Sequence, residues 1–297
     1  MPDLVRCLRV ALLPQEGNGA DSQYLRLAEL PALCCQAAGG EPEWADAVTA
    51  AWLCFYQAAH LMDSVQDQDE PEPWWAEAGP GMALNVASGL FFSAALVLEQ
   101  MRSETHPGSA ATQVSAEFYR GALSMCSGQQ LELTCREPGL GQYWSFANQK
   151  SGTFFALACG AGARLGSDER HKLEALRNFG QQLGLYIQVR DDLAEFRPAR
   201  AFGKARGGVH LASTLPVVYA REVLPESERR RLSTAVWAAQ ENPEAAAEVA
   251  DLVEQSGASL FILTEIERLR CEAKAALSST ALESQAVARL GILMEIQ

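Results

Sequence analysis

Residues 51–67 have the sequence AWLCFYQAAHLMDSVQD, an apolar run that ends in two aspartates. Neither glycine nor proline interrupts this run, so we expect one unbroken helix. Asp63 and Asp67 are four residues apart and therefore share one face of that helix, where two carboxylates repel each other unless something neutralises them. The helix macrodipole also opposes negative charge at a helix carboxyl end, so a cation would stabilise this position twice over.

A second segment, residues 186–195, has the sequence YIQVRDDLAE and repeats the pattern at the end of another apolar helix. Asp191 and Glu195 lie four residues apart, and Gln188 falls on the same side and is expected to orient a water or a phosphate. Taken singly, each acidic segment also suits a helix end that emerges into solvent. Two of them in one chain favour Mg²⁺, which prefers carboxylate oxygens and keeps waters for a phosphate-bearing ligand.

The remainder of the chain predicts an all-α fold, because apolar residues recur at spacings of three and four and β-branched alternation is nearly absent. One domain is expected over residues 1–297, since no linker or repeat divides the chain. Residues 80–98 and 150–165 lack a polar stripe, which predicts central helices. Helices are expected at about 24–39, 43–66, 80–103, 110–133, 142–165, 168–196, 213–221, 226–239, 243–255 and 258–278.

Composition excludes several classes of partner. The 24 basic and 37 acidic residues leave a net charge of −13, which argues against nucleic acid and anionic lipid. The eight cysteines show no metal-ligand spacing and mostly lie in apolar runs, which predicts free thiols and a cytoplasmic location. The apolar window at 82–98 carries Asn85, Ser88, Gly89 and Ser93, so we expect a core helix and no membrane span.

The two acidic segments resemble the aspartate-rich motifs of the trans-isoprenyl diphosphate synthases, also called polyprenyl synthetases. Residues 63–67 resemble the DDxxD motif of that family and residues 186–195 its FQxxDDxxD motif. The resemblance covers the chain from about residue 22 to residue 275. Four shorter motifs match in order and approximate spacing, namely Gly128-Gln129, Lys150-Ser151-Gly152, Gly203-Lys204 and Thr214-Leu215-Pro216.

The resemblance implies an isoprenoid-synthase helical bundle around a central cavity, and a homodimer that pairs through its central helices. It implies an allylic prenyl diphosphate as substrate, bound through Mg²⁺. The carboxylates expected to hold the metal are Asp63, Asp67, Asp191 and Glu195, of which the three aspartates would be catalytic. Lys150 and Lys204 would contact the diphosphate. Ala58 and Ala59 would lie beneath it, where small side chains leave room for chains longer than ten carbons.

Two departures from the family concern the second substrate. Members that add isopentenyl diphosphate carry a basic GGKxxRP stretch, whereas residues 22–28 here are SQYLRLA. The family's paired arginines after the first motif are replaced by residues 70–77, EPEPWWAE, and Ala212 stands in place of the lysine before TLP. Three functions therefore stay open: chain elongation by isopentenyl diphosphate, a terpene synthase or a prenyltransferase to a non-diphosphate acceptor, and a non-catalytic regulatory subunit of a prenyl synthase.

Overall fold

The computed structural model describes residues 2–12, 27–67, 71–103, 110–195, 208–239 and 242–295. All regular secondary structure in these ranges is helical, which confirms the all-α prediction. The helices are α1 (Pro2–Leu12), α3 (Leu30–Ala38), η1 (Pro42–Ala45), α4 (Asp46–Gln66), α5 (Pro73–Ala76), α6 (Pro80–Ser103), α7 (Ala110–Thr134), α8 (Leu140–Ala147), η2 (Asn148–Gly152), α9 (Thr153–Gly166), α10 (Arg170–Glu195), α12 (Gly208–Ser213), α13 (Leu215–Val223), α14 (Glu226–Ala238), α15 (Pro243–Gln255), α16 (Ala258–Ser278), α17 (Ser284–Ile292) and η3 (Leu293–Glu295).

Most predicted helices are present, and the differences have identifiable causes. The helix predicted at 142–165 consists of α8, the π-helical segment η2 and α9. The one predicted at 213–221 corresponds to α13, which begins at Leu215 because the backbone of Thr214 is extended. Among the described residues, the sequence analysis did not predict α1, the short α5, α12, the 3₁₀ turn η3, or α17, which buries Ala286 and Leu290.

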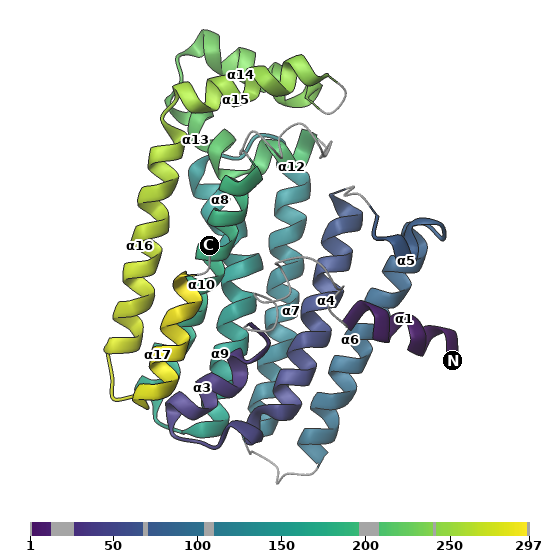
Figure 1. Ribbon diagram of the computed structural model, residues 1–297, viewed down its shortest axis with the longest axis vertical. Helices are drawn as coiled ribbons and strands as arrows, with labels where there is room; N and C mark the ends of the chain where they lie inside the picture. Colours follow the sequence, from purple (N-terminus) through teal and green to yellow (C-terminus); the bar gives the residue numbers. More distant parts are fainter. Residues whose placement is uncertain are drawn as a thin grey trace.

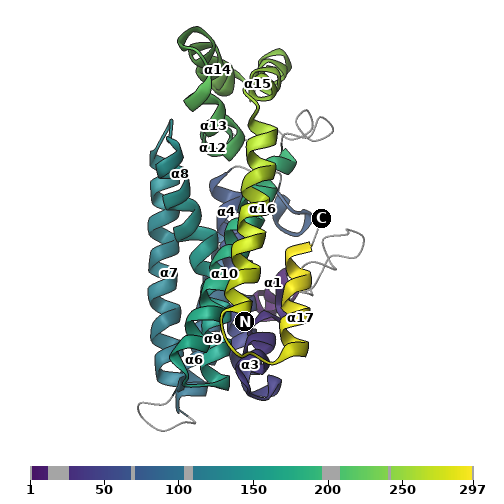
Figure 2. The same cartoon turned by 90° about the vertical axis from the view of Figure 1, so that its left-hand side faces the viewer.

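The long helices α4, α6, α7, α10 and α16 run along the longest axis of the molecule, and α14 and α15 lie across one end of it (Figure 1). Seen from the side, α17 lies next to α3 (Figure 2), so the last helix packs against an early one. Residues 154–163 of α9 are all buried, as expected for a central helix. A separate hydrophobic cluster packs α14 and α15 on α12 and α13, and it includes Leu232, Val236 and Leu252.

Helix α6 corrects the sequence analysis, which placed it in the centre. One side packs on α4 through Val86, Ala87 and Leu90, but Phe92 and Leu96 on the other side are 75% and 61% exposed. By length and composition α6 is also one helix that could cross a membrane, although 33% of its most apolar window is buried against the rest of the chain. An apolar face left open in this way is typical of a surface that another molecule covers.

Glycines set the distance between α9 and the helices around it. A Cβ atom added at Gly162 would lie 2.0 Å from the carbonyl oxygen of Pro31, at the start of α3. A Cβ atom at Gly180 of α10 would lie 2.5 Å from the carbonyl oxygen of Phe155. Both contacts are far inside the van der Waals limit, so only glycine allows these backbones to approach so closely. This approach packs α3 and α10 closely on α9, at different points along its length.

Substituting Gly162→Ala should therefore destabilise the protein by about 1–3 kcal/mol, because the backbone of α3 cannot move away without disturbing the core. The matched control is Gly160→Ala on the same helix, where an added Cβ atom meets nothing nearer than the Arg177 side chain at 3.8 Å. Urea unfolding of both variants measures the difference. Equal stability of the two would contradict the close packing of α3 on α9.

Candidate functional site

The site is built around η2, the π-helical turn that carries Lys150. Two glycines let neighbouring helices reach this turn: a Cβ atom at Gly128 of α7 would lie 2.8 Å from Cβ of Gln149, and one at Gly184 of α10 would lie 2.2 Å from the carbonyl oxygen of Ser151. A π turn widens the helix by one residue and is common at functional sites. Here it directs Lys150 between α4 and α7.

Lys150 connects two carboxylates. Its Nζ atom lies 3.3 Å from Oδ1 of Asp63, at the end of α4, and also donates to Glu132 of α7. Ser213 Oγ donates to the other oxygen of Glu132 at 3.0 Å. Burial alone lowers the pKa of Lys150, but the carboxylates of Asp63 and Glu132 outweigh it and raise the pKa above its ordinary value. The ammonium group therefore stays charged at neutral pH.

Asp67, the second carboxylate of the first motif, caps α4 and lies against α12. Its Oδ2 atom is 3.1 Å from Nδ1 of His210, and the side chain is only 9% exposed. Asp63, one turn earlier, is 44% exposed. The first motif thus contains one partly exposed carboxylate, Asp63, and one nearly buried carboxylate, Asp67, which contacts α12.

The second motif divides in the same way. Asp191 is 56% exposed and lies 3.1 Å from the Arg190 guanidinium. Asp192 is buried and accepts three hydrogen bonds, from the Tyr143 hydroxyl at 2.8 Å, the Gln188 amide at 2.9 Å and the backbone N–H of Leu215 at 2.8 Å. The last bond satisfies a free N–H in the first turn of α13, next to Pro216, which has none. Asp192 therefore anchors α8 and α13 to α10.

Gln188 links the second motif to the lysine turn. It accepts a hydrogen bond from Ser151 Oγ at 2.7 Å while it donates to Asp192. The ends of α4 and α10 consequently both contact η2: Asp63 of α4 contacts Lys150, and Gln188 of α10 contacts Ser151. Both acidic motifs come together at one end of the bundle.

Some predicted residues lie at the limits of the described chain. Lys204 and the residues 22–26 are outside the described residues, and Glu195 is the last residue of α10, with its side chain not described. Within the described ranges, no three Asp, Glu, His or Cys side chains are grouped closely enough to hold a metal ion. In this structure Asp63 is paired with Lys150 and Asp67 with His210.

The region below Asp63 is rich in aromatic side chains. Ala58 is fully buried against α6, in a cluster with Leu61 and Leu90, whereas Ala59 is half-buried. Two turns below Asp63 on the same face, Phe55 packs at ring-centroid distances of 5.2, 5.9 and 6.4 Å on side chains of three other helices, namely Phe91, Phe154 and Phe118. The acidic end of the bundle therefore stands over an apolar interior.

Three side chains of the site were missed by the sequence analysis: Glu132, Asp192 and His210. Glu132 had a detectable signal, because it lies four residues after Gly128 and so shares the face of α7 that meets η2. Asp192 is part of the quoted motif but was given no role, since adjacent acidic residues look alike in sequence. His210 had no signal, because only the position of α12 brings it to Asp67.

The bundle and its paired acidic helix ends define the class of protein: an all-helical fold of the isoprenyl synthase type. A family model described as polyprenyl synthetase matches residues 26–255. The chain belongs to the polyprenyl synthetase family.

Similar proteins agree with this assignment. A curated relative, the short chain isoprenyl diphosphate synthase of Methanothermobacter thermautotrophicus, is 28% identical over 78% of this chain and 73% of its own length. Isoprenyl diphosphate synthases are prenyltransferases. Two solved structures share the fold. Geranylgeranyl pyrophosphate synthase from Corynebacterium glutamicum, complexed with isoprenyl diphosphate and magnesium, has a TM-score of 0.79 and 18% identity, over 99% of this chain and 89% of that one. Polyprenyl synthase from Caulobacter crescentus, complexed with calcium and isoprenyl diphosphate, has a TM-score of 0.77 and 20% identity, over 99% of this chain and 94% of that one.

The two adjacent aspartates of the second motif should respond differently to substitution. Asp192→Asn replaces an acceptor oxygen by an amide that faces hydrogen-bond donors, so it should lower the free energy of unfolding by about 1–3 kcal/mol. Asp191→Asn, at an exposed side chain, should change it by less than about 0.5 kcal/mol. Urea unfolding of both variants distinguishes the roles. A stable Asp192→Asn variant would show that the three hydrogen bonds do not hold α13.

Proposed function

We propose that this protein binds an allylic prenyl diphosphate at the acidic end of the bundle and ionises it, with chain elongation by isopentenyl diphosphate as the reaction favoured by its family. The observation that carries the proposal is the position of Lys150, a buried ammonium that contacts Asp63 of α4, on a turn whose next residue, Ser151, donates to Gln188 of α10. A charged donor in such a place suits an anionic group that is brought in together with a metal.

Asp63, Asp67, Asp191 and Glu195 are the proposed ligands of Mg²⁺. Their carboxylates are the hard oxygen donors that this ion prefers, and Asp63 and Asp191 are exposed enough to receive an ion from solvent. Asp192 is not among them, because its oxygens already accept three hydrogen bonds. When bound, Mg²⁺ would supply positive charge to the diphosphate that leaves the prenyl group.

The chain's own residues support this chemistry. Lys150 stays protonated and can donate to a diphosphate oxygen, while Glu132 and Ser213 keep its position. Cleavage of the allylic C–O bond leaves its electron pair on the diphosphate and a cation on the prenyl group. The apolar interior beneath Asp63 excludes water from that cation. Lys204 is proposed as a second diphosphate contact, and Ala58 and Ala59 as the small residues that admit the prenyl chain.

A different acceptor is favoured by one structural observation. Where the family carries paired arginines, the described residues 71–79 contain no basic side chain and form the short helix α5. Trp75 is buried there and the indole of Trp74 donates to Glu72 at 3.2 Å. An acidic and aromatic segment would repel a second diphosphate. An acceptor without a diphosphate, or cyclisation of the cation as in a terpene synthase, is therefore the second candidate.

The test is release of diphosphate from a C15 allylic diphosphate in the presence of Mg²⁺, with and without isopentenyl diphosphate. Release only with isopentenyl diphosphate supports elongation, and release without it supports the second candidate. Asp63→Asn and Asp191→Asn should each lower turnover by roughly 100-fold or more, since each removes a proposed metal ligand. Asp46→Asn, at the exposed start of the same helix α4, is the matched control and should keep full activity.

Two results would contradict these proposals. Near wild-type turnover of Asp63→Asn or Asp191→Asn with Mg²⁺ would contradict the metal assignment. Absence of turnover with either substrate combination would contradict elongation and cyclisation, and would favour a regulatory subunit or an acceptor that the assay does not contain.

We also propose that the protein is a homodimer that pairs through α6 and α7. Exposed apolar side chains gather on these two neighbouring helices, most clearly Phe92 (75% exposed), Leu96 and Leu123 (70% exposed). A second copy of the same surface would bury them and remove the cost of their exposure to water. The open face of α6 is explained by this pairing without a membrane.

Light scattering after size exclusion should give twice 32.1 kDa for the wild type at micromolar concentration. Phe92→Asp and Leu123→Asp should each give the monomer mass, because each places a charge in an apolar contact. Leu260→Asp on α16, at a leucine that is 73% exposed, is the matched control and should stay dimeric. A wild type that elutes at the monomer mass would refute the proposed dimer.

A further inference from the structure

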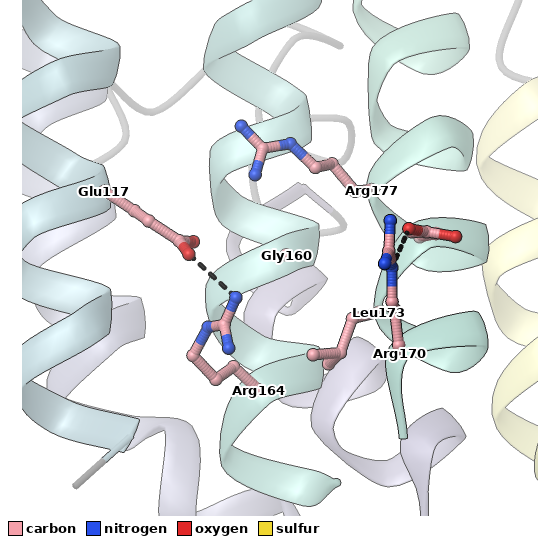
Figure 3. A pocket seen from close by; sticks show the side chains of 7 residues that line it. Glu117, Gly160, Arg164, Arg170, Leu173 and Arg177 are labelled. Atoms are coloured by element: carbon pink, nitrogen blue, oxygen red, sulfur yellow. Dashed lines mark hydrogen bonds and ion pairs between the residues drawn. The ribbon is translucent and has the colours of Figure 1, made fainter. Parts of the chain in front are cut away.

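A hollow of about 240 Å³ opens between α7, α9 and α10 (Figure 3). It is lined by three arginines, two glutamates, one leucine and Gly160. Arg177, on its wall, precedes Asp191 by fourteen residues of α10, which is about 21 Å along the helix axis at 1.5 Å per residue. The hollow is therefore a place distinct from the proposed active site.

The charges around the hollow do not cancel. Arg164 forms an ion pair with Glu117 at 2.8 Å, and Arg170 forms one with Glu174 at 2.6 Å. Arg177 has no such pair within the described part of the chain. The hollow consequently carries one unbalanced positive charge in a chain whose net charge is −13. This local excess favours an anion.

Arg164 adds an unused hydrogen-bond donor. Its terminal nitrogens bond to Gln113 at 2.7 Å and to Glu117 at 2.8 Å, but its Nε atom is buried and has no hydrogen-bond partner among the described residues. Buried donors are rarely left without an acceptor. An anion in the hollow could supply one if the Arg164 side chain turned toward it, since the atom is enclosed in this structure.

Gly160 leaves space beside these arginines, although helix packing does not require a glycine at this position. A Cβ atom there would meet only the aliphatic stem of Arg177, at 3.8 Å, whereas at Gly162 of the same helix it would lie 2.0 Å from a backbone oxygen. Glycine at position 162 serves packing, and glycine at position 160 does not. Its effect is to keep the floor of the hollow open.

We propose that this hollow binds a small phosphate-type oxyanion, such as inorganic phosphate or diphosphate, through Arg177 and Arg164. The guanidinium of Arg177 can match phosphate oxygens with paired hydrogen bonds, whereas both terminal nitrogens of Arg164 already donate to Gln113 and Glu117, which leaves Nε as its donor. The volume equals that of roughly eight waters and lies below the roughly 300–1,000 Å³ of sites for drug-sized ligands. Together with the charged lining, this size suits a compact ion and excludes a prenyl chain.

The test is calorimetric titration of the full chain, kept free of metal by EDTA, with inorganic phosphate and separately with inorganic diphosphate. Arg177→Gln removes the unbalanced charge and Gly160→Leu fills the hollow while all three arginines remain. Each should weaken binding at least tenfold. Arg120→Gln is the matched control, at an exposed arginine of α7 that does not line the hollow, and should bind like the wild type. Comparison of the two anions shows which one the hollow prefers.

Absence of saturable binding to the wild type would overturn the proposal. Equal binding by the wild type, Arg177→Gln and Gly160→Leu would also overturn it, because the anion would then lie elsewhere, for example at Lys150. Arg177 is exposed, so its substitution should not unfold the protein, and it decides the question even if Gly160→Leu is unstable. The titration needs no turnover and is independent of the proposed function.

Discussion

A buried ammonium group must be paired, and this constraint organises one whole end of the molecule. Lys150 is 17% exposed and contacts Asp63 of α4 and Glu132 of α7. Leaving either the lysine or Glu132 without its partner would bury an uncompensated charge, which costs several kcal/mol. The π turn that carries Lys150 can hold this position only because α7 and α10 approach it at glycines. Charge pairing and close backbone packing therefore depend on each other.

The carboxylates at this end fall into two groups according to what surrounds them. Glu132 and Asp192 are buried and accept hydrogen bonds from residues of other helices, so they hold helices in place. Asp63 and Asp191 are largely exposed and remain accessible to a ligand. A site that must bind an ion benefits from this division, because the buried group gives rigidity and the exposed group gives access.

Apolar residues show a similar division. The interior below Asp63 is closed by aromatic rings from four helices, whereas α6 and α7 also carry large apolar side chains on the outside. In a single chain the exposed apolar side chains of α6 and α7 contribute nothing to stability, because their contact with water is unfavourable. The proposed dimer gives them a partner. The charged hollow between α7, α9 and α10 is different in kind, because charged side chains make up most of its lining.

The sequence by itself determined the helical class, most helix positions and both acidic motifs, since periodicity and the spacing of carboxylates are local properties. The resemblance to the family also singled out Lys150, whose contact with a diphosphate stays a prediction. Tertiary structure alone decided that the Asp192 side chain is buried and structural, whereas the Asp191 side chain is exposed. Neighbouring side chains on a helix point about 100° apart, and only the packing of α8 and α13 on α10 determines which of the two is buried. The same holds for His210, because no sequence pattern records that α12 meets the end of α4.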